Sequence, residues 1–222
     1  MSSLLNINAA SLYEELFSLY GNTQWWPGET DDEIILGAIL TQNTSWSNVE
    51  KSLSRIRNEG LMKLEMLADI DKSHLIELIH SSGFYNQKAR TIIELSKMIV
   101  SNYGGIDAMK NESNEKLEAF IKPISGIGQE TMDAILCYAL DKPVFVVDKY
   151  TLRLMDRLGV KNVSNIRKAK EYVLASIGED LGKLKNLHGL IVNFSKDYCR
   201  SKPACNDCPL RNKCDFASGK QD

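Results

Sequence analysis

The sequence contains no apolar run that approaches the ~20 residues a membrane-spanning helix requires. Its first residues, Met1-Ser-Ser-Leu, lack the basic segment followed by a hydrophobic segment that marks a secretory signal. Internal repeats and low-complexity tracts are also missing. These absences argue against membrane-bound, secreted and repeat proteins, and they predict a cytoplasmic chain with no membrane partner.

Alternating patterns typical of β-strands are nearly absent, whereas apolar residues recur at three- and four-residue spacing. Gly, Asn and Pro residues separate the segments with this spacing. The predicted helices are Ser11–Tyr20, Asp31–Leu40, Ser47–Arg57, Lys72–Ile79, Asn86–Asn102, Asn114–Ile121, Gln129–Leu140, Lys149–Leu158, Ile166–Ile177 and Leu184–Cys199. The fold class is therefore predicted to be all-α. With 222 residues, 43% hydrophobic and 25% charged, the chain can bury one sizeable core or two small lobes.

The net charge of −2 by itself argues weakly against a nucleic-acid partner. The charges are unevenly distributed, however, because residues 1–141 carry 11 Lys and Arg against 20 Asp and Glu, whereas residues 142–222 carry 16 against 9. A basic C-terminal third would attract phosphates, although such asymmetry also occurs on a solvated face. The composition changes near Asp141–Pro143.

Four of the five cysteines fall in one short segment, at Cys199, Cys205, Cys208 and Cys214. In a chain without a secretory signal, such clustering indicates metal ligation in place of disulfides. Zinc sites usually combine two separated Cys-x2-Cys pairs, and only one is present here. We therefore favour a [4Fe–4S] cluster held by four thiolates over zinc. The fifth cysteine, Cys137, lies on a predicted apolar helix and is expected in the core.

A Gly-x-Gly turn, Gly126-Ile-Gly128, lies between two predicted amphipathic helices. Glycines permit a tight turn, and the N-terminus of the following helix offers backbone N–H groups and a positive dipole end to a phosphate. Asp148 follows about twenty residues later, at the start of another predicted helix. An aspartate there is commonly an N-cap, and Asp148 can combine that role with a functional one.

Taken together, the Ile124–Thr131 turn, its flanking helices and Val147-Asp148-Lys149-Tyr150 resemble the helix-hairpin-helix and Gly/Pro-Asp motif of the endonuclease III superfamily of DNA glycosylases. The resemblance implies a six-helix lobe over residues 30–142, with the hairpin at about 114–140. Residues 1–29 and 143–222 would form a second lobe, with the active site in the cleft between the two. The cysteine segment resembles the family's iron–sulfur loop over residues 199–214, although its first spacing is one residue shorter. Lys202 and the neighbouring basic residues would then face DNA phosphates.

The same resemblance assigns the chemistry. Asp148 would stabilise the positive charge that develops on the sugar as the base leaves, and it would activate water. Bifunctional members of the family place a Schiff-base lysine two residues after the second glycine, and this chain has Glu130 there. Lys149 adjoins Asp148, but neighbouring side chains on a helix diverge by about 100°. The chain is therefore predicted to be monofunctional, without AP lyase activity.

Five segments taken together resemble the 3-methyladenine DNA glycosylase III branch of the superfamily. They are Thr23–Pro27, Leu40–Trp46, Ser82–Ala89, Asp133–Tyr138 and Val146–Tyr150. Alkylated purines are cations with a weakened glycosidic bond, so aromatic side chains would bind them by stacking and cation–π attraction. The predicted base-pocket residues are Trp25, Trp26, Pro27, Trp46, Glu130 and Lys149. A Trp-Trp-Pro turn that fills the core is the structural alternative.

A flipped base leaves a gap in the duplex that a side chain must fill. By resemblance to endonuclease III, Gln42 occupies the family's wedge position, and Phe84 or Tyr85 supplies a second inserting side chain. The predicted DNA-binding residues are Gln42, Phe84, Tyr85, Gly126, Gly128 and Lys202. A glutamine at a helix end is also ordinary surface chemistry.

The predicted function is removal of alkylated purines from damaged double-stranded DNA in base excision repair, by a monomer associated with the nucleoid. Two alternatives stay open. One is an endonuclease III-like glycosylase, with or without AP lyase activity, that acts on oxidised or mismatched pyrimidines. The other is a non-catalytic DNA-binding module. The branch that the pocket resembles includes members without the iron–sulfur loop, so the chain combines features of two branches.

Overall fold

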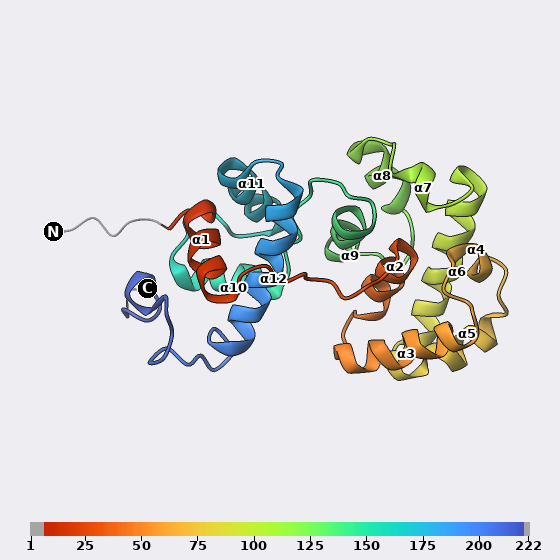
Figure 1. Ribbon diagram of the computed structural model, residues 1–222, viewed down its shortest axis with the longest axis horizontal. Helices are drawn as coiled ribbons and strands as arrows, with labels where there is room; N and C mark the ends of the chain where they lie inside the picture. Colours follow the sequence, from red (N-terminus) through yellow and green to blue (C-terminus); the bar gives the residue numbers. More distant parts are fainter. Residues whose placement is uncertain (1–6, 220–222) are drawn as a thin grey trace. The chain divides into compact units, whose positions relative to one another are not determined.

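The computed structural model describes residues 7–219, and no strand occurs within that range (Figure 1). The prediction of an all-α fold class is therefore confirmed for this part of the chain. The chain divides into two compact units. Unit 1 contains the described residues up to Trp25 and those from Pro143 onward, and unit 2 contains Trp26–Lys142. Among the described residues, no helix is both long and apolar enough to cross a membrane.

Unit 2 is built around α2, which is buried along most of its length. Ile35, Leu36, Ile39 and Leu40 are at most 1% exposed, as expected of a helix that is apolar on all sides after its acidic first turn. Helices α3, α6 and α9 pack against it. The helices of this unit are α2 Asp31–Leu40, α3 Trp46–Asn58, α4 Leu64–Leu67, α5 Lys72–Ile79, α6 Tyr85–Tyr103, α7 Ile106–Met109, α8 Asn114–Ile121 and α9 Gln129–Ala134.

Unit 1 consists of α1 Ala9–Tyr20, α10 Lys149–Leu158, α11 Ile166–Ile177 and α12 Leu181–Asp197. Helix α12 carries the unit's core, because α1 and α10 both pack against it. Asn8, Asp148, Asn165 and Asp180 cap the four helices with side-chain oxygens that accept backbone N–H bonds. Each cap satisfies a donor that the first turn of a helix leaves unpaired. Polar residues in the sequence thus determine where the helices of this unit begin.

The structure differs from the predicted helices at two places that bear on function. The predicted helix Gln129–Leu140 is α-helical only to Ala134 and continues as a buried π-helical turn over Ile135–Ala139. The helix predicted at Leu184–Cys199 begins at Leu181 and ends at Asp197, so Cys199 follows it. The one-turn helices α4 and α7 were not predicted, because four residues are too few to show a helical period.

Candidate functional site

The two glycines of the Gly-x-Gly turn have different environments. Gly126 has a φ of 91°, and a Cβ atom there would lie 2.3 Å from Thr91 Oγ1 on α6. The Thr91 hydroxyl also donates a hydrogen bond to Ser125 O at 2.7 Å, which fixes the turn on α6. Gly126 is therefore required both for the backbone conformation and for close packing.

Gly128 is exposed and has an ordinary φ of −85°. It is the N-cap residue of α9 and supplies no side-chain cap, and a Cβ atom on it would meet nothing within 4 Å. The first N–H groups of α9 therefore have no capping side chain, and the backbone is open to approach. This arrangement is suited to binding an anion.

Gln42 lies just beyond α2 and is bound to the hairpin. Its Nε2 atom donates to Gly126 O and to Thr131 Oγ1, both at 3.0 Å. Both contacts hold the Gly-x-Gly turn against the end of α2. A Gln42 side chain that entered DNA would first have to break these two hydrogen bonds, so the role that the structure displays is support of the hairpin.

Phe84 is the exposed member of the other predicted inserting pair. Its side chain is 69% exposed, and its φ of 48° is uncommon for a residue with a bulky side chain. Tyr85 is half-buried, and its ring stacks on His80 with centroids 4.6 Å apart. Phe84 is thus the side chain of this turn that is available to a large partner.

Two of the three predicted pocket tryptophans form an aromatic cluster with Tyr138 in unit 2. Trp26 stacks on Tyr138 with ring centroids 5.1 Å apart, and Trp46 meets Trp26 edge-on at 6.2 Å. A Cβ atom on Gly37 would lie within 3.5 Å of both indole rings, so the absence of a side chain there lets both rings pack closely on α2. Trp46 Nε1 donates to Glu50 at 3.1 Å. We call Trp26, Trp46 and Tyr138 the aromatic cluster.

Trp25 belongs to unit 1 and packs on α12. A Cβ atom on Gly189 would lie 2.5 Å from Trp25 Cβ. The indole ring meets the His188 ring edge-on at 6.0 Å, and Lys196 Nζ lies 5.2 Å from the indole centroid. Trp25 and Trp26 are adjacent in sequence but pack in different units. Pro27, which follows them, is exposed.

Asp148 is buried, with only 8% of its surface exposed, and it caps α10. Its Oδ1 atom accepts from Thr151 N at 2.8 Å and from Thr151 Oγ1 at 2.9 Å. Its Oδ2 atom faces His188 Nε2 at 3.7 Å, a distance that suits an ion pair but is too long for a hydrogen bond. One oxygen thus serves the helix, and the other faces the buried imidazole.

The protonation of Asp148 follows from these contacts. Burial raises the pKa of the carboxyl group, but His188 and the two bonds from Thr151 outweigh that effect, so the pKa lies below its ordinary value. Asp148 is therefore an ionised carboxylate inside the protein. The capping role predicted for Asp148 is confirmed, whereas its catalytic role stays a prediction. Sequence reasoning missed the contact with His188, because the two residues lie forty positions apart in the chain.

The remaining predicted pocket residues, Glu130 and Lys149, are both exposed. Glu130 lies in the first turn of α9, where a carboxylate is favoured by the helix dipole. Lys149 Nζ lies 5.3 Å from the centroid of the Tyr150 ring. The structure thus gives each of them an ordinary surface interaction, and their predicted roles stay predictions.

The four clustered cysteines line one pocket of unit 1, together with apolar side chains from α10, α12 and the C-terminal segment, among them Leu154, Phe194 and Leu210. Burial raises the pKa of the Cys208 and Cys214 thiols, and the other cysteines of the group add to the effect. Within residues 7–219, no three His, Cys, Asp or Glu side chains are arranged as a metal site. Four cysteines that line one apolar pocket are nevertheless the donor set of a thiolate-ligated cluster.

Arg157 of α10 holds the cysteine segment in place. Its guanidinium donates to Arg200 O at 2.6 Å and to Ser201 O at 3.2 Å, and it also contacts Cys199 O and Sγ, each at 3.4 Å. Lys202 on the same segment is exposed, as a phosphate-binding residue must be. Lys213, one of the basic residues near Lys202 that were predicted to face DNA phosphates, forms an ion pair with Glu15 of α1.

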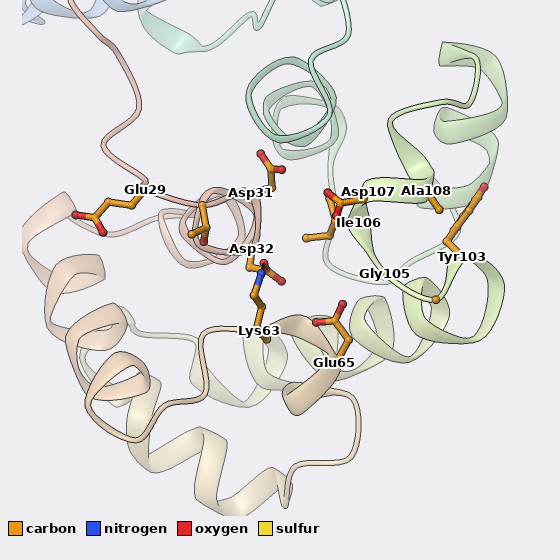
Figure 2. A pocket seen from close by; sticks show the side chains of 12 residues that line it. Glu29, Asp31, Asp32, Lys63, Glu65, Tyr103, Gly105, Ile106, Asp107 and Ala108 are labelled. Atoms are coloured by element: carbon orange, nitrogen blue, oxygen red, sulfur yellow. Dashed lines mark hydrogen bonds and ion pairs between the residues drawn. The ribbon is translucent and has the colours of Figure 1, made fainter.

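A separate pocket of about 560 Å³ lies in unit 2 and is lined by none of the predicted site residues. Figure 2 shows carboxylates of Asp31, Asp32, Glu65 and Asp107 around it, with Lys63 beside Asp32. Lys63 Nζ binds Asp32 Oδ2 at 2.9 Å. Excess negative charge at this pocket would repel a phosphate backbone, so it is not a candidate nucleic-acid site.

Comparisons with known proteins agree with these motifs. The model of the HhH-GPD superfamily of base excision DNA repair proteins matches residues 36–178. A Methanocaldococcus jannaschii protein, named provisionally as a DNA repair glycosylase, is 42% identical over 91% of this chain and 94% of its own length. Endonuclease III of Thermotoga maritima is 30% identical over 85% of this chain and 84% of that protein.

A solved structure is also similar to this chain, that of H. pylori 3-methyladenine DNA glycosylase bound to 1,N6-ethenoadenine. Its TM-score is 0.77 at 33% identity, and the match covers 86% of this chain and 98% of the other.

Proposed function

The chain belongs to the HhH-GPD superfamily of base excision DNA repair proteins, and on that premise we propose that it is a monofunctional DNA glycosylase that removes alkylated purines such as 3-methyladenine from double-stranded DNA. The predicted superfamily is thereby confirmed. Units 2 and 1 would correspond to the family's two lobes, and the protein would act as a monomer. The observation that carries the proposed chemistry is the buried, ionised Asp148 with one oxygen fixed by α10.

Asp148 would stabilise the transition state of base release. Thr151 fixes Oδ1 through two hydrogen bonds, which leaves Oδ2 to act on the sugar or on water. Loss of the base builds positive charge at the sugar, and a carboxylate fixed in a low-dielectric interior stabilises such charge strongly. His188 faces Oδ2 and helps to keep the carboxyl group ionised.

Single-step hydrolysis is favoured over strand cleavage because no lysine occupies the family's Schiff-base position. Glu130 stands there, and a carboxylate cannot form an imine with the sugar. Lys149 is exposed and lies against Tyr150. Borohydride reduction in the presence of damaged DNA would give a covalent adduct only if an amine of the protein forms a Schiff base, and we expect none.

The aromatic cluster supports the choice of an alkylated purine. The half-buried Trp26 and Trp46 would offer indole π-faces to a positively charged base, with the buried Tyr138 stacked against Trp26. The similar H. pylori enzyme is named as a 3-methyladenine DNA glycosylase, and its structure holds a modified adenine. An already cationic base is a good leaving group, so little acid catalysis is required of the pocket.

Cys199, Cys205, Cys208 and Cys214 would hold a [4Fe–4S] cluster. The cluster would crosslink the segment after α12 and stiffen it, so that exposed Lys202 meets DNA phosphates. Arg157 already ties this segment to α10 through backbone carbonyls.

An endonuclease III-like activity on pyrimidines is the second candidate. It is favoured by the cysteine-lined pocket and by the 30% identity to T. maritima endonuclease III. This candidate predicts release of an oxidised or mismatched pyrimidine, which the first candidate does not. If the enzyme also cleaves the strand, borohydride should trap a covalent adduct with DNA.

The decisive experiment measures bases released from methylated duplex DNA by wild type and by Asp148→Asn, with chromatographic separation of the products. We expect free 3-methyladenine from the wild type alone, while both proteins bind DNA. Asn keeps an oxygen that can cap α10, so the variant should remain folded. Release of pyrimidines instead of purines would support the second candidate, and DNA binding with no release from any lesion would indicate a binding module.

A further inference from the structure

Lys88 is a buried lysine near the start of α6, with 3% of its surface exposed. Its Nζ atom donates to Leu40 O at 2.8 Å and to Ser82 O at 2.7 Å. Among residues 7–219, no carboxylate forms an ion pair with it. The ammonium group is therefore held by two backbone carbonyls in the interior of unit 2.

Such an arrangement is costly, because a buried cation loses its hydration and two neutral acceptors restore only part of it. Burial accordingly lowers the pKa of Lys88 to about 8. The carbonyls partly compensate, because Leu40 is the last residue of α2 and Ser82 is the last residue of the 3-10 turn His80–Ser82. Helix C-termini present unpaired carbonyl groups that attract positive charge.

The two carbonyls lie immediately before the two loops that carry the predicted DNA-inserting side chains. Leu40 precedes the loop with Gln42 and Asn43, and Asn43 has a φ of 54°. Ser82 precedes Gly83 and Phe84, and Phe84 has a φ of 48°. Residues in this part of conformational space persist only where the surrounding structure holds them.

We infer that Lys88 is a positioning residue, whose ammonium group joins the loop after α2 to the turn before α6 and holds both in the arrangement that base flipping requires, with Gln42 bonded to the hairpin and Phe84 exposed. This inference rests on the proposed glycosylase function. Lys88 itself is too deeply buried to touch DNA. It acts by removing the freedom of two loops that are far apart in sequence and adjacent in space.

The test compares Lys88→Met, which keeps length and loses both bonds, with Lys88→Arg, which keeps the charge and the donors. Lys97→Met is the matched control, because Lys97 is an exposed lysine on the same helix. Three quantities are measured: the single-turnover rate constant for base release, the affinity for undamaged duplex, and the fluorescence of 2-aminopurine beside the lesion, which reports unstacking.

For Lys88→Met we expect at least a tenfold loss in the rate constant and a loss of the 2-aminopurine signal, with affinity for undamaged DNA changed less than threefold. Lys88→Arg should recover part of both losses, and Lys97→Met should match the wild type. A wild-type rate constant in Lys88→Met would overturn the inference, as would equal losses in the rate constant and in binding to undamaged DNA. If Lys88→Met does not fold, Lys88→Gln, which retains a donor, is measured in its place.

A separate readout distinguishes failure of this inference from failure of the proposed function. Amide hydrogen exchange of residues 41–45 and 83–87 needs no substrate, and we expect it to rise in Lys88→Met but not in Lys97→Met. If the wild type excises no lesion while amide exchange rises in Lys88→Met as expected, the glycosylase proposal fails but the role of Lys88 in holding the two loops is supported. Unchanged amide exchange in both loops of Lys88→Met would overturn the role of Lys88 in holding them.

Discussion

Substituting alanine for Gly126 tests why the Gly-x-Gly turn has its sequence. A φ of 91° is strained for alanine, at about 1–3 kcal/mol. The added Cβ atom would lie 2.3 Å from Thr91 Oγ1, which forces the hydroxyl away from Ser125 O and loses a hydrogen bond worth about 1 kcal/mol. We therefore expect the free energy of unfolding of Gly126→Ala to fall by about 2–4 kcal/mol.

Gly128→Ala is the matched control in the same turn. Its φ of −85° suits any residue, and its Cβ atom would meet nothing within 4 Å. We expect a loss of stability of less than about 1 kcal/mol, the scale of an N-cap change. The new methyl group would, however, lie on the open backbone where the sequence predicts phosphate binding, so DNA affinity should fall while stability is retained.

Urea unfolding followed by circular dichroism gives the stabilities, and fluorescence anisotropy with labelled duplex gives the affinities. The two variants should separate, with Gly126→Ala destabilised and Gly128→Ala impaired in binding. Equal stabilities of the two variants would refute the assignment of Gly126 to packing. Unchanged affinity in Gly128→Ala would refute the assignment of Gly128 to the DNA-facing backbone.

Three further predictions follow from the buried charges and the cysteines. In His188→Gln the acidic limb of the single-turnover rate against pH should move to higher pH, because the effect of burial on the pKa of Asp148 is then opposed by Thr151 alone. An unmoved limb would contradict a role for His188. Urea titrations should show the free energy of unfolding of the wild type, relative to that of Lys88→Met, rising with pH between about 8 and 10.5. The unfolded chain binds more protons than the folded chain in this range, so the slope is at most about 1.4 kcal/mol per pH unit. A fall in this free-energy difference with pH would contradict the lowered pKa of Lys88. Anaerobically purified wild type should contain about four iron atoms per chain and Cys208→Ala should lose them, by metal analysis; stoichiometric zinc would contradict an iron–sulfur cluster.

Much of the fold could be predicted from the sequence, because apolar periodicity and capping residues act locally. The helices at Asp31–Leu40, Lys72–Ile79, Asn114–Ile121 and Ile166–Ile177 have the predicted bounds. Burial of Cys137, at 1% exposure, is confirmed as well. The capping role of Asp148 could be predicted because an aspartate at the start of an amphipathic helix is visible in the linear pattern.

The partners of the site residues could not be predicted in the same way. His188 stands alone in the sequence and reaches Asp148 only because α12 packs on α10. Lys88 would ordinarily be placed on the surface, since lysine is rarely buried. Trp25 and Trp26 are neighbours, yet Trp26 adopts a φ of 80° and packs in the other unit from Trp25. Long-range packing decides each of these outcomes.

The π-helical turn over Ile135–Ala139 also bears on how this chain is aligned with its relatives. Such a turn accommodates one more residue than an α-helix of the same length, and each residue of an α-helix advances the side chains by about 100°. The sequence of a relative with an unbroken α-helix here would have to be aligned with a one-residue gap at this turn. Without that gap, every later residue of this chain would be aligned with the wrong residue of the relative. Tyr138 stacks on Trp26, so such an error would pair Trp26 with the wrong side chain of the relative.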